Sequence, residues 1–185
     1  AFLEKSCTPK EVLEKTAEAT ISFDREFIST NCNGQEHCFD PNTNTIYLSP
    51  YLVEGKTLAS FENRLAHSYG HVISNALDPT KDVGGKTSLW QPIAGKKLEA
   101  QQLTFEEAQA NLFAMLYFKS KDSTYNADMT EITKSLLVSN SFKSSGDRIP
   151  GVVSSILFYY YSEDDPSLAF GDFMHVISSP ETLEE

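Results

Sequence analysis

One segment, TLASFENRLAHSYGHVISNAL (57–77), constrains the fold more than any other part of the chain. Its apolar residues recur near every third or fourth position, which is the spacing of one buried face of an α-helix. The Asp78-Pro79 pair that follows is typical of a helix end. The segment therefore predicts a long helix with one face in the core. The apolar residues of that face are Leu58, Phe61, Leu65, Val72, Ile73 and Leu77.

The same segment carries two histidines, His67 and His71, four positions apart. On a helix, residues four apart lie on one face with their side-chain roots about 5–6 Å apart, so two imidazoles can converge on one metal ion. A catalytic zinc takes three protein ligands and leaves a fourth position open. The pair therefore predicts a zinc site that needs a third ligand from elsewhere. The competing interpretation is two ordinary half-buried or surface histidines.

Three stretches follow one another in an order that resembles a known group of enzymes. They are CFDPNTNTIYLS (38–49), LAHSYGHVI (65–73) and EEAQANLFA (106–114). The set, spanning roughly 32–118, resembles gluzincin-type zinc metallopeptidases of the thermolysin-like clan, and most closely a group of uncharacterised bacterial metallopeptidases. The resemblance implies one zincin-like domain over 1–185, with a small sheet and an active-site-type helix.

The resemblance also implies a set of metal ligands and a supporting residue. His67 and His71 match the two helical histidines, and Glu107 matches the third ligand. Asn111 stands four residues later, where the family usually has an aspartate that hydrogen-bonds a ligand histidine. Gly70 matches the small residue common before the second histidine. Zinc is the cofactor that this set implies.

Ser68 is where the chain departs from the family. The family motif has a glutamate between the histidines, which takes a proton from zinc-bound water. A neutral serine hydroxyl cannot accept that proton, and loss of a general acid–base typically removes ~10²–10⁴ in rate. Tyr69 points to another side of the helix, and Glu106 is a weak substitute on the second helix. The resemblance therefore predicts a metallopeptidase-like pseudoenzyme, with no residue assigned as catalytic.

Glu107 and the remaining histidines also have simpler interpretations. Thr104 and Glu107 fit a capping box, in which Glu107 would bond the Thr104 amide instead of a metal. Asn111 has a plain alternative as a polar residue on an exposed stripe. His37 is expected to be a solvated turn residue, and His175 a structural one.

The rest of the pattern predicts an α+β fold, because short β-rich stretches stand among several helical ones. Residues 78–103 are expected to form a long irregular excursion around Trp90, of the kind that is often functional. Strands are expected at 20–28 and 45–49, and helices at 8–19, 57–77, 104–121, 129–142, 150–162 and 166–178.

The cysteines favour an oxidising compartment. Cys32 and Cys38 bracket the polar turn NGQEH, which predicts a small disulfide-closed loop and leaves Cys7 unpaired. The chain begins at Ala1 without a recognisable signal peptide, and no apolar run is long enough to span a bilayer. These features are expected of a secreted or periplasmic protein, and three free cytosolic thiols are the alternative.

Net charge and the absence of common motifs argue against several classes of function. The formal net charge of −11 argues against nucleic acid or an anionic membrane as the main partner. There is no Walker loop, dinucleotide fingerprint, Gly-x-Ser-x-Gly or CxxC. Three hypotheses remain open: a degenerate metallopeptidase-like protein that binds a peptide or protein, an active zinc peptidase with a displaced base, and a secreted helical binding domain without metal.

Overall fold

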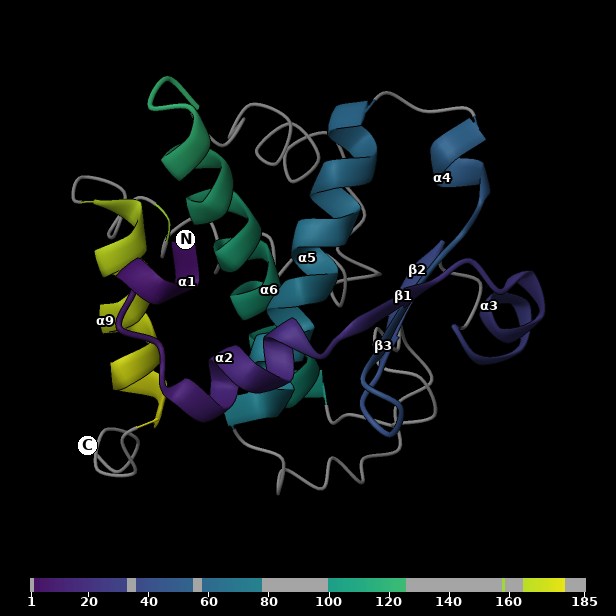
Figure 1. Ribbon diagram of the computed structural model, residues 1–185, viewed down its shortest axis with the longest axis horizontal. Helices are drawn as coiled ribbons and strands as arrows, with labels where there is room; N and C mark the ends of the chain where they lie inside the picture. Colours follow the sequence, from purple (N-terminus) through teal and green to yellow (C-terminus); the bar gives the residue numbers. More distant parts are fainter. Residues whose placement is uncertain are drawn as a thin grey trace.

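The computed structural model describes residues 2–32, 36–54, 58–77, 100–125, 158 and 165–178, with the backbone alone at 58–60, 100–107 and 176–178. Over these ranges the protein is a mixed α+β structure of seven helices and one three-stranded sheet, which confirms the predicted class (Figure 1). The helices are α1 (Phe2–Lys5), α2 (Lys10–Ala17), α3 (Arg25–Asn31), α4 (Tyr51–Glu54), α5 (Leu58–Leu77), α6 (Ala100–Lys121) and α9 (Pro166–Ser178). The strands are β1 (Thr20–Ser22), β2 (His37–Asp40) and β3 (Thr45–Leu48).

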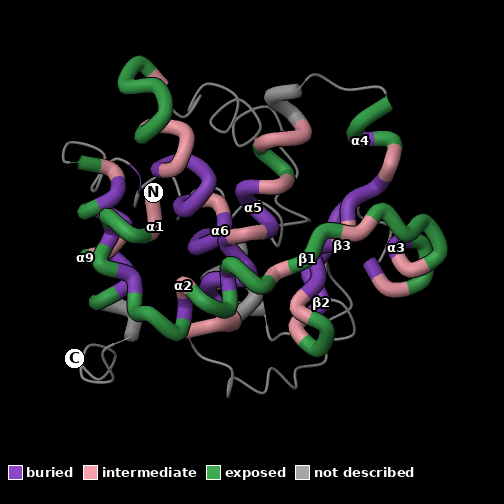
Figure 2. The backbone as a smooth tube through the Cα atoms, in the orientation of Figure 1, coloured by how far each residue is buried: buried purple, intermediate pink, exposed green. Residues whose placement is uncertain are grey.

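Helix α5 occupies the centre, between α6 on one side and the sheet on the other (Figure 1). Buried residues are concentrated along α5, α6 and strands β2 and β3, whereas α2, α3 and α4 are largely exposed (Figure 2). The predicted helix at 57–77 is therefore confirmed as α5, and it is the element around which the rest packs.

The two sides of α5 bury different apolar clusters. On the sheet side, Val72 packs with Phe39, Ile46, Leu48 and Leu52. On the α6 side, Ile73 joins a larger cluster that reaches across to α9. The members contributed by α6 and α9 are Leu112, Phe113, Met115, Leu116, Phe170, Phe173 and Met174. Because both faces are covered, any polar residue on the buried stripe between them must find a partner inside the protein.

The sheet has the order β1-β3-β2, with β1 parallel and β2 antiparallel to the central strand. A tight turn joins β2 to β3. Asp40 accepts hydrogen bonds from the Asn42 amide at 3.0 Å and the Thr43 hydroxyl at 2.8 Å, and Asn44 adopts a positive φ of 49° that asparagine tolerates. The register pairs His37 with Leu48, so the turn decides where His37 lies.

The predicted strand at 20–28 is correct only at its start. Strand β1 ends at Ser22, and α3 begins at Arg25. Asp24 is the cause, because its carboxylate accepts the backbone N–H groups of Glu26 and Phe27 at 2.9 and 3.0 Å and caps a new helix. The alternation of apolar and polar residues continues to Phe27, but the capping residue Asp24 ends the strand before it.

The second long helix is also longer than predicted. Helix α6 begins at Ala100, so residues 100–103, expected to be irregular, are helical. Helix α2 and helix α9 lie where 8–19 and 166–178 were expected, and β3 (Thr45–Leu48) lies within the strand expected at 45–49. The irregular segment at 78–99 and the helix predicted at 129–142 lie outside the described residues, and so does 150–162 except for the buried, helical Phe158.

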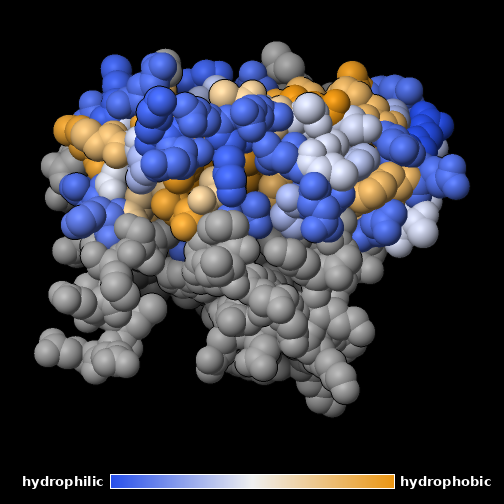
Figure 3. All heavy atoms as spheres, turned by 60° about the horizontal axis from the view of Figure 1, so that its bottom comes forward, coloured by the Kyte–Doolittle hydropathy of each residue, from blue (hydrophilic) through white to orange (hydrophobic). Residues whose placement is uncertain are grey.

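The predicted disulfide is present, with Cys32 and Cys38 joined and their Cα atoms 5.5 Å apart. It ties the end of α3 to β2, and both cysteines are buried with Ile28. Cys7 is a free, exposed thiol, as expected. In the face shown in Figure 3, hydrophilic side chains cover much of the described surface, with smaller hydrophobic areas between them. No described helix is long and apolar enough to cross a membrane.

Candidate functional site

The imidazoles of His67 and His71 meet inside the protein. Their Nε2 atoms lie 3.0 Å apart, and their ring planes are nearly perpendicular at 82°. Both residues are buried, with 6% and 1% of their surface exposed. Each ring therefore presents Nε2 to the same small volume, where one nitrogen can donate a hydrogen bond to the other or both can direct lone pairs at one cation.

Helix α6 fixes the orientation of the first histidine. The Oδ1 atom of Asn111 lies 3.0 Å from Nδ1 of His67. An amide oxygen only accepts hydrogen bonds, so Nδ1 of His67 carries the proton and its Nε2 keeps a lone pair. That lone pair is directed toward His71. A ligand histidine in zinc sites is usually held by such a bond from its other ring nitrogen.

The bond between His67 and Asn111 depends on a close approach of α5 to α6 at Gly70. A Cβ atom at position 70 would lie 2.5 Å from Cα and 2.9 Å from the carbonyl oxygen of Ala110. Only glycine fits there, because both contacts are with main-chain atoms. The glycine before the second histidine is thus required for helix packing.

Glu107, the third predicted ligand, lies on α6 one helical turn before Asn111. Its side chain lies outside the described residues, so its contact with the histidine pair stays a prediction. The course of the backbone excludes the capping box of Thr104 and Glu107. Helix α6 begins at Ala100, so Thr104 is within the helix and is not its N-cap. Glu106, the weaker candidate, also lies outside the described side chains.

Ser68 is completely buried, and its hydroxyl is occupied. Its Oγ lies 3.0 Å from Nδ1 of His37, which is itself only 3% exposed. The expectation that His37 is a solvated turn residue is therefore wrong. His37 is the first residue of β2, and pairing with β3 turns its side chain toward α5. The only signal in the sequence was the turn after Asp40, which sets the register.

The hydrogen bonds of His37 do not activate Ser68. Nη1 of Arg64 lies 3.4 Å from Nε2 of His37, and a guanidinium can only donate. Nε2 of His37 is then the acceptor, and its Nδ1–H donates to Ser68. The His37 ring also lies edge-on to that of His67, with centroids 5.4 Å apart. His37 thus adds a third imidazole beside the pair without acting as a base toward the serine.

The remaining candidates lie away from this group. His175 is exposed on α9, and Tyr69 is half-buried and faces a cavity on another side of α5. Within the described side chains, no group of three or more histidine, cysteine, aspartate or glutamate residues is arranged to hold a metal, and that set does not include Glu107. Comparison of the chain with protein-family models, curated proteins and solved structures gives no match.

Proposed function

We propose that this chain is a degenerate zinc-metallopeptidase-like protein. In this proposal His67, His71 and Glu107 hold zinc, and the former active site binds a peptide or protein rather than cutting it. The observation that carries the proposal is the 3.0 Å separation of the two Nε2 atoms. With Zn–N bonds of 2.0–2.1 Å, two nitrogens on one tetrahedral zinc lie roughly 3.3 Å apart, so the pair needs little movement to accept the ion.

The residues around the pair suit a binding site better than a hydrolytic one. Bound zinc would supply a positive centre that attracts a carbonyl or carboxylate of the ligand. Asn111 holds His67 in the tautomer that a metal requires. Ser68 bonds to His37 and has no basic lone pair to offer at neutral pH, so no described residue takes the role of the missing glutamate.

The Cys32–Cys38 disulfide supports an oxidising location for this function. Disulfides persist in secreted and periplasmic proteins and are rare in the reducing cytosol. We therefore place the protein outside the cytosol, where its peptide or protein partner would also be found.

Zinc content and affinity test the proposal directly. Protein purified without chelator is expected to contain one equivalent of zinc, and titration calorimetry of stripped protein should give one site. His175→Ala is the matched control, because it removes an exposed histidine on α9 and should leave stoichiometry and affinity unchanged. Absence of zinc from the purified protein, together with no heat of binding at micromolar zinc, would refute the metal site.

Asn111→Leu is expected to weaken zinc binding by about 10–100-fold, the usual effect of losing an outer partner of a ligand histidine. Leucine fills a similar volume but cannot accept the Nδ1 proton of His67. Asn111→Asp should act in the opposite direction, because a carboxylate accepts the same proton more strongly. The measurement is the zinc dissociation constant by competition with a chromogenic chelator. Equal affinity in all three proteins would mean that Asn111 does not support a ligand.

The substitution Ser68→Glu distinguishes two hypotheses: a degenerate site that has lost its general base, and an active peptidase whose general base lies elsewhere. The parent is expected to show no chelator-sensitive cleavage of a fluorogenic peptide library, and Ser68→Glu to raise cleavage by about 10²–10⁴-fold over that background. Ser68→Gln is the control, since it has the size of glutamate without the charge. Chelator-sensitive cleavage by the parent that survives Ser68→Gln would instead establish an active metallopeptidase.

A further inference from the structure

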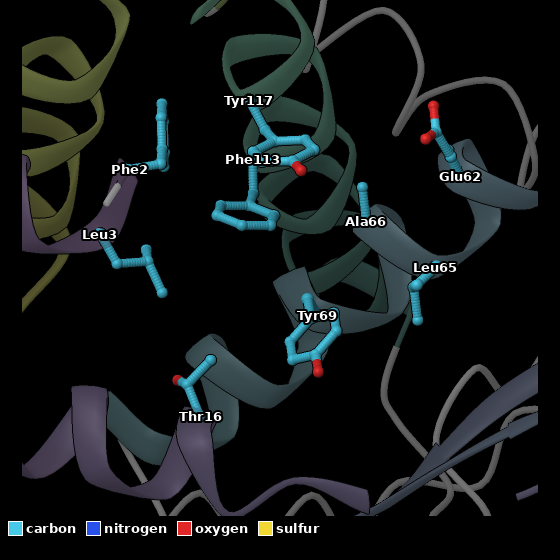
Figure 4. A pocket seen from close by; sticks show the side chains of 9 residues that line it. All are labelled: Phe2, Leu3, Thr16, Glu62, Leu65, Ala66, Tyr69, Phe113 and Tyr117. Atoms are coloured by element: carbon cyan, nitrogen blue, oxygen red, sulfur yellow. The ribbon is translucent and has the colours of Figure 1, made fainter. Parts of the chain in front are cut away.

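A second feature lies on the far side of α5 from the histidines. A cavity of about 440 Å³ opens between α1, α2, α5 and α6 (Figure 4). The rings of Phe113, Tyr117 and Tyr69 and the side chains of Phe2 and Leu65 line it. Its volume lies within the range of small-molecule sites, about 300–1,000 Å³, and its mainly apolar lining is also typical of them.

The cavity is separate from the candidate metal site. Glu62, Leu65 and Tyr69 lie on one stripe of α5 by their spacing of three and four, whereas His67 and His71 lie roughly opposite on the helix. Helix α5 also approaches α6 closely at Gly70 and Ala110. A ligand in the cavity can therefore bind without touching the histidines.

The carboxylate of Glu62 at the cavity favours a cation, which would compete with the neighbouring Lys121 ammonium. Glu62 is the one charged residue among the described residues of the lining, and it lies at the edge of the group in Figure 4. The chain as a whole carries a net charge of −11. Aromatic faces attract ammonium groups, and an anionic ligand would be repelled by Glu62.

One ammonium group already lies beside the cavity. Nζ of Lys121 lies 5.0 Å from the centroid of the Tyr117 ring. Its hydrogen bond to Tyr117 raises the pKa of Lys121, and electrostatic interactions with Tyr117 and with Glu62 add to the rise. Lys121 is exposed on the last turn of α6, so a ligand cation would compete with its ammonium group for the Tyr117 ring and Glu62.

We propose that this cavity binds a small organic amine, with its apolar body between the aromatic side chains and its ammonium group between the Tyr117 ring and the Glu62 carboxylate. The body of the ligand supplies most of the affinity, and the ammonium supplies the selectivity. The site is independent of the metal site and stands whether or not zinc binds.

Three probes of one shape test the proposal: 4-phenylbutylamine, 4-phenylbutanol and 4-phenylbutyrate, which are cationic, neutral and anionic at pH 7. Binding to the whole chain is followed by methyl NMR. The amine is expected to bind about five- to tenfold more tightly than the alcohol, and the butyrate more weakly than both. Methyl signals of Leu65 and Ala66 should shift, while that of Leu48 in the sheet core should not.

Two substitutions should change amine affinity in opposite directions. Glu62→Gln should lower it toward that of the alcohol, with the Tyr117 ring retaining part of the preference, and Lys121→Gln should raise it by removing the competing ammonium. His71→Ala is the control and should leave amine binding unchanged, which keeps this test distinct from the zinc test. Equal affinity for amine and butyrate, no effect of Glu62→Gln, or no binding of any probe at millimolar concentration would each overturn the proposal.

Discussion

His71→Ala is expected to reduce zinc affinity by about 10³-fold or more. The loss of an outer partner alone costs about 10–100-fold, and His71 would bind the metal directly. Without it, the site keeps one described imidazole and the predicted Glu107, and two ligands do not make the three-ligand site that a zinc of this type requires.

The measurement is zinc affinity by chelator competition, with His71→Gln beside His71→Ala. Glutamine retains more of the buried side-chain volume, so it separates loss of the ligand from loss of packing. Urea unfolding in the presence of chelator shows that each variant is folded before zinc is added. Affinity within threefold of the parent in both variants would exclude His71 as a ligand.

Gly70→Ala is expected to lower the free energy of unfolding by about 3 kcal/mol, at the upper end of the usual cost of overpacking. The added Cβ would lie 2.5 Å from Cα of Ala110, so the helices must move apart. In an open helix the same change stabilises by about 1 kcal/mol, because alanine is the better helix former. A decrease in stability on Gly70→Ala therefore indicates that α5 and α6 approach closely at this position, and an increase would indicate that they do not.

Urea denaturation monitored by circular dichroism gives this free energy. Asn63→Ala is the matched control, since it also introduces alanine, at an exposed position of α5, and should change stability by no more than about 0.7 kcal/mol. Gly70→Ala should also weaken zinc binding, because separation of the helices lengthens the bond between His67 and Asn111. A more stable Gly70→Ala protein would contradict the structure.

The sequence predicted those parts of the fold whose signal is local. The apolar spacing of 57–77 gave α5 to within one residue, and the polar turn between Cys32 and Cys38 gave the disulfide. Errors arose where one local signal overrode another. The alternation of apolar residues predicted a strand past Asp24, although the carboxylate of Asp24 caps a helix. The capping pattern at 104–107 predicted a helix start at Thr104, although the helix begins at Ala100.

The candidate site also has one part that local sequence predicts and one part that it does not. His67 and His71 meet because of a spacing of four on one helix, which any reader of the sequence can see. His37 joins them only through the pairing of β2 with β3 and the packing of that sheet on α5, which involve residues far apart in the chain. No pattern of neighbouring residues encodes that contact, so sequence reasoning placed His37 in solvent.

The Gly70–Ala110 contact has a consequence for the tolerance of this protein to change. Main-chain atoms, which every amino acid shares, set the spacing of α5 and α6 at the histidines. We therefore expect the separation of His67 from Asn111 to depend more on this main-chain contact than on the size of core side chains that face α9, such as Met174. A substitution at position 70 is then expected to disturb the histidine pair more than a substitution at a core position that faces α9.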